Sequence, residues 1–270
     1  MNGKNSQENH SWAYDSKQAF SDKQFGFISG RSTTLQLLIV MEEWTEILDN
    51  GGTLDSIYMD FMKAFDKVPH KRLLRKLRSY GLSEQIIKWV EDFLRDRSQK
   101  VSVNNSESRD RPVTSGIPQG SVLDLILFVI YINDMPECVN ASTYLFADET
   151  KIYKEISCED DVSGLQADLD QLQKWSDTWL LKFHPNKCKV RSVSNKTKLE
   201  NKSSYHLYND EGEEVELEMS EEEKEIEELV DRNLSFSKHI IQKVNKANSI
   251  MGLIRRTYTF LEYIVSIICQ

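Results

Sequence analysis

The feature that most constrains the fold is a pair of adjacent carboxylates between two apolar runs. Residues 144–153 read YLFADETKIY, with Asp148 and Glu149 at the centre. Apolar and β-branched residues on both sides of a short polar interruption are typical of two strands joined by a tight turn. Two adjacent acids repel each other, and a divalent cation can neutralise them. The segment therefore predicts a β-hairpin with a metal site at its tip, although a solvated turn would explain an isolated pair of acids as well.

A second acid, Asp60, ends another strand-like run, which reads DSIYMDF over residues 55–61. Three motifs then follow in a fixed order: IYMDFMKAFDKVPH at 57–70, SGIPQGS at 115–121 and FADE at 146–149. Their order and spacing resemble the palm of the reverse transcriptase of a non-LTR, LINE-type retrotransposon. The resemblance extends from about Gln24 to Arg256, which is nearly the whole chain.

The resemblance implies an α+β fold, the palm of a right-hand polymerase with an antiparallel sheet, packed helices, partial fingers and a partial thumb. It also implies RNA-directed DNA synthesis by two-metal nucleotidyl transfer, with an RNA template, a DNA primer and deoxynucleoside triphosphates as partners. Asp60, Asp148 and Glu149 would be the catalytic, metal-binding acids. The ion would be Mg²⁺, with Mn²⁺ as the alternative.

Five further positions match family residues that approach the incoming nucleotide. The Phe61 carbonyl would assist one metal ion, and the Phe65 ring would exclude a 2′-hydroxyl, although core packing explains Phe65 equally simply. Gln119 and Gly120 match a loop that contacts nucleotide and template, and they also read as a turn before the next helix. Lys187 matches a lysine near the leaving pyrophosphate, although a lone lysine after a turn usually faces solvent.

The chain departs from the family pattern at several positions. Glu149 replaces a second aspartate, Ile28 a common arginine, and Asp124-Leu125 a Gly-Pro pair, while the primer-grip pattern Leu-Gly-Val reads Ile226-Glu227-Glu228. We also expect that the upstream fingers segment is absent, that the chain ends inside the thumb and that it lacks an endonuclease. These departures predict an impaired or inactive polymerase. The alternative is a catalytically dead remnant that binds nucleic acid or protein.

Length and charge bound the organisation of the chain. With 270 residues it can form one large domain or two small ones. We expect a disordered leader over 1–23, partial fingers and palm over 24–194, an acidic linker over 195–228, and a thumb-like helical segment over 229–270. The net charge is −9, and most of the acidic excess lies in residues 211–228. From Asn195 to Glu228 the chain is expected to form a loop with a solvated helix or ribbon.

Hydrophobic periodicity predicts individual elements. Helices are expected over 33–49, 71–80, 83–96, 122–132, 161–181 and 238–256, and strands over 55–61, 100–103 and 188–193. The first helix should direct one face inward, formed by Leu37, Leu38, Met41, Trp44 and Leu48. Ser121 should cap the apolar helix that follows, in which a buried environment would disfavour Asp124. The basic residues of 71–78 could follow template phosphates or form a solvated face.

Neither a secretory signal nor a membrane segment is indicated. The first ten residues are polar, and the longest apolar run, 125–132, is too short to span a bilayer. The four cysteines, at positions 138, 158, 188 and 269, have neither disulfide-framework nor zinc-ribbon spacing. An intracellular location, in the nucleus or the cytoplasm, is therefore expected. The oligomeric state stays open.

Overall fold

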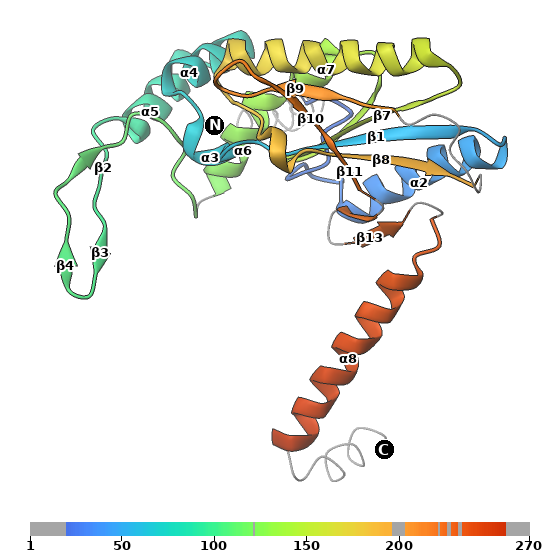
Figure 1. Cartoon of the computed structure of the whole chain (residues 1–270). Coiled ribbons are helices and arrows are strands. Elements are labelled where there is room, and N and C mark those ends of the chain that lie inside the picture. The colour runs from blue at the N-terminus through green and yellow to red at the C-terminus, as the bar shows by residue number, and fades with distance from the viewer. Residues whose placement is uncertain are drawn as a thin grey trace, which may run out of the picture. The chain divides into compact units, whose positions relative to one another are not determined.

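The computed structural model describes residues 20–120, 122–195, 203–220, 222–225, 228–231 and 234–257. The chain divides into two compact units, a larger one of residues 1–220 and a smaller one of residues 221–270. Helices and a mixed sheet form the larger unit (Figure 1), so the expected α+β class is confirmed.

A five-stranded sheet with the order β11-β8-β1-β7-β6 is the centre of the larger unit. The strands are β1 (Thr53–Met59), β6 (Ser142–Phe146), β7 (Glu149–Glu155), β8 (Lys189–Ser194) and β11 (Glu218–Met219). The central strand β1 is antiparallel to both β7 and β8, and Met59 is paired with Thr150. The predicted carboxylate hairpin is present: β6 and β7 pair directly, with Ala147 and Asp148 between them.

Helices cover both faces of this sheet. Those concerned are α2 (Thr33–Asp49), α6 (Val122–Ile132) and α7 (Glu159–Trp179). Figure 1 shows α7 on one face and α2 on the other. Because side chains alternate along a strand, Ile57 and Met59 of β1 join the core on the α6 and α7 side. On the opposite face, the Trp44 ring of α2 meets the Tyr153 ring edge-on, with 5.5 Å between centroids.

The predicted face of α2 is partly wrong. The helix buries one row of residues spaced four apart, Gln36, Val40, Trp44 and Leu48. This row packs on the sheet as a single ridge, as helix surfaces commonly do. Leu38 is 63% exposed, and Leu37 and Met41 are only partly buried. Tertiary packing thus selected a row with a buried glutamine over one richer in leucine.

Three helices and a long hairpin arm follow β1 (Figure 1). The helices are α3 (Ala64–Lys67), α4 (His70–Ser79) and α5 (Glu84–Leu94), and the arm consists of β2 (Ser98–Gln99), β3 (Ser102–Val103), β4 (Ser106–Glu107) and β5 (Arg111–Pro112). Asn104 and Asn105 form the predicted turn at the arm's tip, both with positive φ. Two short 3-10 helices, η1 (Met135–Cys138) and η2 (Pro185–Lys187), complete the connections.

The acidic segment after β8 differs from its expected character. It contains a ribbon, β9 (His206–Tyr208) paired with β10 (Glu214–Glu216), followed by β11, which pairs in parallel with β8. The expected ribbon is therefore present, but full solvation is wrong, because Tyr205, Leu207 and Leu217 are buried in the main core. The Tyr205 hydroxyl donates to the buried Asp55 carboxylate of β1 at 2.8 Å. Three apolar side chains decide the packing of a segment whose composition is otherwise acidic.

The smaller unit contains a two-stranded ribbon and one long helix. The elements are β12 (Glu222–Glu225), β13 (Glu228–Asp231) and α8 (Ser237–Thr257), the last close to the predicted bounds. Glu228 contacts His239 Nε2 at 2.5 Å and Lys243 Nζ at 3.7 Å. Ile226 and Glu227, the other two positions of the altered primer-grip pattern, lie outside the described residues, as do Ser121 and residues 1–19. Within the described part of the chain, no helix is long and apolar enough to cross a membrane.

Candidate active site

Two neighbouring strands bring the predicted acids to the same end of the sheet. Asp60 follows Met59, the last residue of β1, and Glu149 begins β7. Since Met59 pairs with Thr150, one further step along the register would set Asp60 opposite Glu149. Asp148 occupies the turn immediately before Glu149. Residues nearly ninety positions apart in sequence therefore meet because a central strand and a hairpin strand end together.

The electrostatics of this strand end favour a cation. Burial raises the pKa of Asp148, and the negative charge of Asp60 raises it further. Among the described residues, no three acid, histidine or cysteine side chains are grouped closely enough to enclose an ion. Asp60 and Asp148 would thus be a two-carboxylate set, which fits an ion that takes its other oxygens from water and phosphates. The participation of Glu149, whose side chain is exposed, stays a prediction.

Asp60 is anchored by residues that precede β8. The Asp60 carbonyl accepts the His184 N–H at 2.8 Å, and the Asp60 N–H lies 3.5 Å from Cys188 Sγ. Burial raises the pKa of the Cys188 thiol to about 12, so it stays protonated at neutral pH. Sequence reasoning missed this cysteine as a neighbour of the site, because no spacing in the chain relates it to Asp60.

Lys187 lies beside the acids. Its Nζ is 3.7 Å from Asp60 Oδ1, and its side chain is 59% exposed. The lysine therefore has both a carboxylate neighbour and access to solvent. The alternative that Lys187 only faces solvent does not account for its contact with Asp60. A role near the leaving pyrophosphate stays a prediction.

Two predicted aromatic residues are packed below the acids. The Phe61 ring is buried and stacks on Phe183 with centroids 4.7 Å apart. The Phe65 ring packs on Phe128 at 4.5 Å and is only partly buried. The core-packing interpretation of Phe65 is thus confirmed, while its exposed part leaves the predicted contact with a sugar open to test.

The predicted nucleotide-binding loop, which contains Gln119 and Gly120, is hydrogen-bonded to residues that follow β1. Gly116 has φ +90, and a Cβ there would lie 2.7 Å from the Asp66 carbonyl oxygen. Only glycine accommodates both the left-handed backbone and this approach. Gln119 Nε2 donates to Asp66 Oδ1 at 3.3 Å, and His70 Nε2 lies 2.8 Å from the Gly116 carbonyl oxygen. Sequence reasoning had not included Asp66, although it stands in the same motif as Asp60.

Asp124 does not have the unfavourable environment expected of it. Its side chain is 3% exposed, and its carboxylate accepts the Gly120 N–H at 2.8 Å and the Leu125 N–H at 2.9 Å. A buried acid is tolerated when hydrogen bonds satisfy its charge, and here the donors come from the nucleotide loop and the first turn of α6. The expectation of a fault at this position is therefore wrong.

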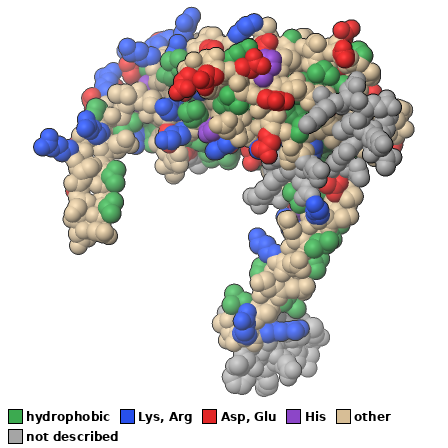
Figure 2. All heavy atoms as spheres, in the orientation of Figure 1, with side chains coloured by type: hydrophobic (Ala, Val, Ile, Leu, Met, Phe, Trp, Pro, Cys, Tyr) green, Lys and Arg blue, Asp and Glu red, His purple; other side chains and the backbone are tan. Residues whose placement is uncertain are grey.

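The basic surface of α4 contains one residue that cannot reach phosphate. Lys71, Arg75 and Arg78 are exposed, and Figure 2 shows Lys and Arg side chains gathered over this helix. Lys76 is 2% exposed instead, and its Nζ donates to Asp134 Oδ1 at 2.5 Å and to the Tyr131 carbonyl. Neither a phosphate contact nor a solvated face describes Lys76.

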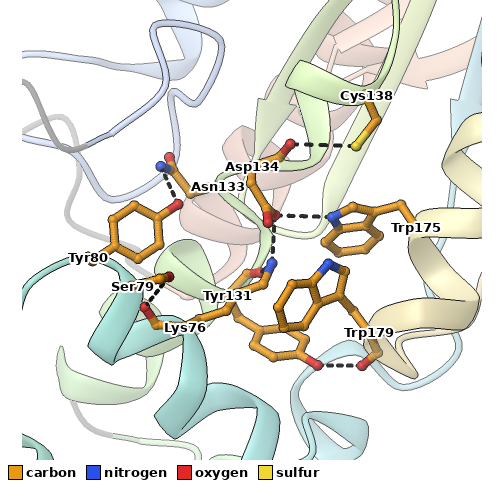
Figure 3. Close-up of polar contacts among 9 residues, drawn as sticks. All are labelled: Lys76, Ser79, Tyr80, Tyr131, Asn133, Asp134, Cys138, Trp175 and Trp179. Carbon is orange, nitrogen blue, oxygen red and sulfur yellow. Dashed lines mark hydrogen bonds and ion pairs between the residues drawn. The ribbon is translucent and has the colours of Figure 1, made fainter.

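Aromatic rings surround the Lys76 ammonium group (Figure 3). Its Nζ lies 3.9 Å from the ring centre of Trp179, 4.9 Å from that of Trp175 and 5.0 Å from that of Tyr131. Trp175 Nε1 also donates to Asp134 at 3.0 Å. Burial lowers the pKa of Lys76 to about 8, although Asp134 opposes the change. This ion pair connects α4 with α6 and α7.

Comparison with known proteins decides the family. Residues 7–230 match a family model described as reverse transcriptase (RNA-dependent DNA polymerase). The chain belongs to this reverse transcriptase family. Every predicted site residue, from Asp60 to Lys187, lies inside the matched range. Members of the family use divalent metal ions and copy RNA, which agrees with the carboxylate pair of this reverse transcriptase domain.

The curated relatives are proteins of mobile elements. The chain is 33% identical over 194 residues to the RNA-directed DNA polymerase from mobile element jockey of Drosophila melanogaster, covering 68% of the chain and 21% of that protein. It is 31% identical over 189 residues to the probable RNA-directed DNA polymerase from transposon BS of the same species, covering 63% and 20%. The chain thus spans about a fifth of these relatives. The predicted resemblance to a non-LTR retrotransposon reverse transcriptase is confirmed.

Solved structures share the fold. Apo telomerase from Candida tropicalis, truncated from its C-terminal domain, superposes with a TM-score of 0.51 at 12% identity, covering 87% of this chain and 49% of that one. Telomerase from Candida albicans, in complex with a fragment of telomeric RNA, gives 0.50 at 12% identity, with 84% and 36% covered. At this identity the likeness concerns the fold alone. The central sheet of this reverse transcriptase domain is therefore a polymerase palm, as predicted.

Proposed function

We propose that this chain is the polymerase domain of a LINE-type retrotransposon protein and that it extends a DNA primer on an RNA template at a reduced rate or not at all. The observation that carries the proposal is the coupling of Asp60 and Asp148 at adjacent strand ends, where the charge of Asp60 raises the pKa of Asp148. Two acids that disfavour each other's charge are kept together at little cost only where a cation compensates them.

Asp60 and Asp148 would hold the divalent ions, with Glu149 as the third acid. Mg²⁺ is the proposed ion and Mn²⁺ the alternative, because carboxylates, waters and phosphates are the ligands that both accept. When bound, the ions would supply positive charge to the attacking and leaving oxygens of the nucleotidyl transfer. Lys187, close to Asp60, would hold the leaving pyrophosphate or donate a proton to it.

The remaining residues would orient the deoxynucleoside triphosphate. The exposed part of Phe65 would contact the sugar, while Phe61, stacked on Phe183, would keep its carbonyl directed at the metal site. Gln119 and Gly120 would contact the base pair. Their loop is held by Asp66 and Asp124, which limits its freedom in the absence of nucleotide.

The proposed loss of rate rests mainly on Glu149. Its side chain is one methylene longer than the aspartate of the family pattern, and displacement of a catalytic group by about 1 Å can cost roughly 10²-fold in rate. Because Glu149 is exposed, its extra length requires no rearrangement of the core. The substitution would therefore affect the reaction and leave the fold unchanged.

Primer extension by the purified full chain tests the proposal. An RNA template with an annealed DNA primer and labelled deoxynucleotides is incubated with Mg²⁺ or Mn²⁺, and an Asp60→Asn variant is compared with Asp160→Asn, an exposed aspartate in the first turn of α7. Extension that Asp60→Asn abolishes and Asp160→Asn retains is the supporting result. The proposal fails if the two variants behave alike in extension and if Asp60→Asn also leaves Mn²⁺ binding unchanged.

A further inference from the structure

We propose that Gln24 is a positioning residue that fixes the backbone turn carrying Asp148. Its side chain is 0% exposed, and its Oε1 accepts the Ala147 N–H at 3.1 Å and the Gly26 N–H at 2.7 Å. Ala147 directly precedes Asp148. The inference rests on the proposed role of Asp148 as a metal ligand, and it assigns to the same site a residue outside the three sequence motifs.

The turn needs such support because its backbone is strained. Ala147 has φ +53, in the left-handed region of backbone conformation that residues other than glycine seldom adopt. A conformation of this kind persists where surrounding contacts over-determine it. The Gln24 side-chain Oε1 supplies one such contact, as a buried acceptor for the Ala147 N–H.

The segment around Gln24 is itself fixed to the hairpin. The Phe25 N–H donates to the Leu145 carbonyl at 2.8 Å, and the Leu145 N–H donates to the Lys23 carbonyl at 2.9 Å, so a short parallel bridge adds to the edge of β6. Arg31 Nη1 also donates to the main-chain carbonyl oxygen of Gln24. The glutamine side chain therefore starts from a backbone whose place relative to β6 is defined.

Gly26 allows the close approach that this contact requires. A Cβ on Gly26 would lie 2.3 Å from the Ala147 nitrogen, a distance that real Cβ atoms essentially never show. Glycine at this position thus serves contact with the turn, since its own φ is ordinary. Gln24 and Gly26 act together: the glycine brings the backbone close, and the glutamine carbonyl occupies the hydrogen-bond site that results.

The test compares three variants of the full chain. Gln24→Met removes the acceptor and keeps the volume of the side chain, while Gln24→Glu keeps an acceptor at the same reach. Gln36→Met is the matched control, because Gln36 is also buried and its carbonyl oxygen has no hydrogen-bond partner among the described residues. Selective labelling with ¹⁵N-alanine allows amide exchange to be followed at Ala147 by NMR.

Gln24→Met should speed exchange of the Ala147 amide by about tenfold or more, which corresponds to about 1.4 kcal/mol. Ala141 is an internal reference, because it directly precedes β6, whereas Ala147 directly follows it, and because its N–H donates to Asp168 at 2.8 Å. Its exchange should not change, Gln36→Met should change neither amide, and Gln24→Glu should restore protection of Ala147. Unchanged exchange at Ala147 in Gln24→Met, or equal acceleration at Ala141, would overturn the inference.

Binding of Mn²⁺, measured by electron paramagnetic resonance, separates this inference from the proposed function. If the native chain binds Mn²⁺ in a manner that Asp60→Asn abolishes, Gln24→Met should weaken that binding at least several-fold with an unchanged unfolding midpoint, and Gln24→Glu should recover it. Unchanged Mn²⁺ affinity in Gln24→Met would refute a positioning role. If the native chain shows no Asp60-dependent binding while Ala147 exchange responds as expected, the proposed function fails and the structural contact stands.

Discussion

Replacing Lys76 by methionine should leave the larger unit as stable as before, or more stable, at pH 7. The side chain is buried among Tyr131, Trp175 and Trp179, and burial lowers its pKa from 10.5 to about 8 (Figure 3). A tenfold change in proton affinity is about 1.4 kcal/mol, so the charged form is disfavoured in the folded chain by about 3 kcal/mol. Methionine fills similar space without a charge, and Asp134, which loses its lysine partner, is not a deeply buried charge, because its side chain is 34% exposed and keeps the Trp175 N–H as a donor.

The pH dependence follows from linkage. Below pH 8 the lysine is protonated in both states, and the cost of the buried charge is fully present. Between pH 8 and pH 10.5 the folded chain has lost a proton that the unfolded chain still holds, so the free energy of unfolding of the native chain rises with pH. Between pH 7 and pH 9.5 the native chain should gain about 2 kcal/mol relative to Lys76→Met.

Urea unfolding at pH 7 and pH 9.5, followed by the tryptophan fluorescence of the chain, measures this difference. Comparing native chain and variant at each pH cancels the contributions of groups that do not interact with Lys76. Lys71→Met, on the exposed side of the same helix, should show no pH-dependent difference. A loss of several kcal/mol in Lys76→Met at pH 7, or a difference that does not vary with pH, would refute the reasoning.

Three further outcomes are expected. Asp124→Ala should lower the free energy of unfolding by about 1–3 kcal/mol, since the Gly120 and Leu125 N–H groups lose a charged acceptor, and chemical denaturation with Asp124→Asn as the milder variant measures this. Glu149→Asp should raise primer extension by roughly 10²-fold at most, because a single carboxylate recovers only a geometric loss; full activity from this change alone would contradict it. The double change Glu211→Gln and Glu214→Gln, at two exposed glutamates of the β9–β10 ribbon, should tighten binding of a primer-template at low salt and have no effect at high salt, and a filter-binding titration at both salt concentrations checks this.

The elements that the sequence predicts well are those specified locally. The helix over 33–49 begins after the N-cap Ser32, whose hydroxyl accepts the Leu35 N–H at 3.1 Å, and it ends at the C-cap Asn50. Both signals can be recognised from residues adjacent to the helix in sequence. The carboxylate hairpin is similar, because two alternating runs and a two-residue interruption define it. In each case the interactions that set the bounds join residues only a few positions apart.

The parts that escape prediction depend on contacts between distant residues. Gln24 and Ala147 are 123 positions apart, and no local pattern relates a glutamine to a turn that it meets only after β6 has formed. Its sequence spacing places Lys76 on a basic helix. Its contacts with Asp134 and with the rings of Tyr131, Trp175 and Trp179 form only when that helix packs against α6 and α7. Burial of Leu217 likewise follows from the pairing of β11 with β8. A charged or polar residue has two possible environments, and its neighbours in sequence do not choose between them.

The environments of the substituted residues also indicate that the fold and the catalytic activity can be lost independently. Two departures from the family pattern differ in kind: Asp124 is buried and has donors that satisfy it, whereas Glu149 is exposed and is a proposed member of the metal site. A substitution of the first kind must be compensated by packing or the domain unfolds, since total stability is only about 5–15 kcal/mol. A substitution of the second kind, at an exposed position, is expected to lower the rate and to leave the packing of the core unchanged. We therefore expect that a chain of this family can lose synthesis while it keeps its palm, so that primer extension and stability have to be measured separately.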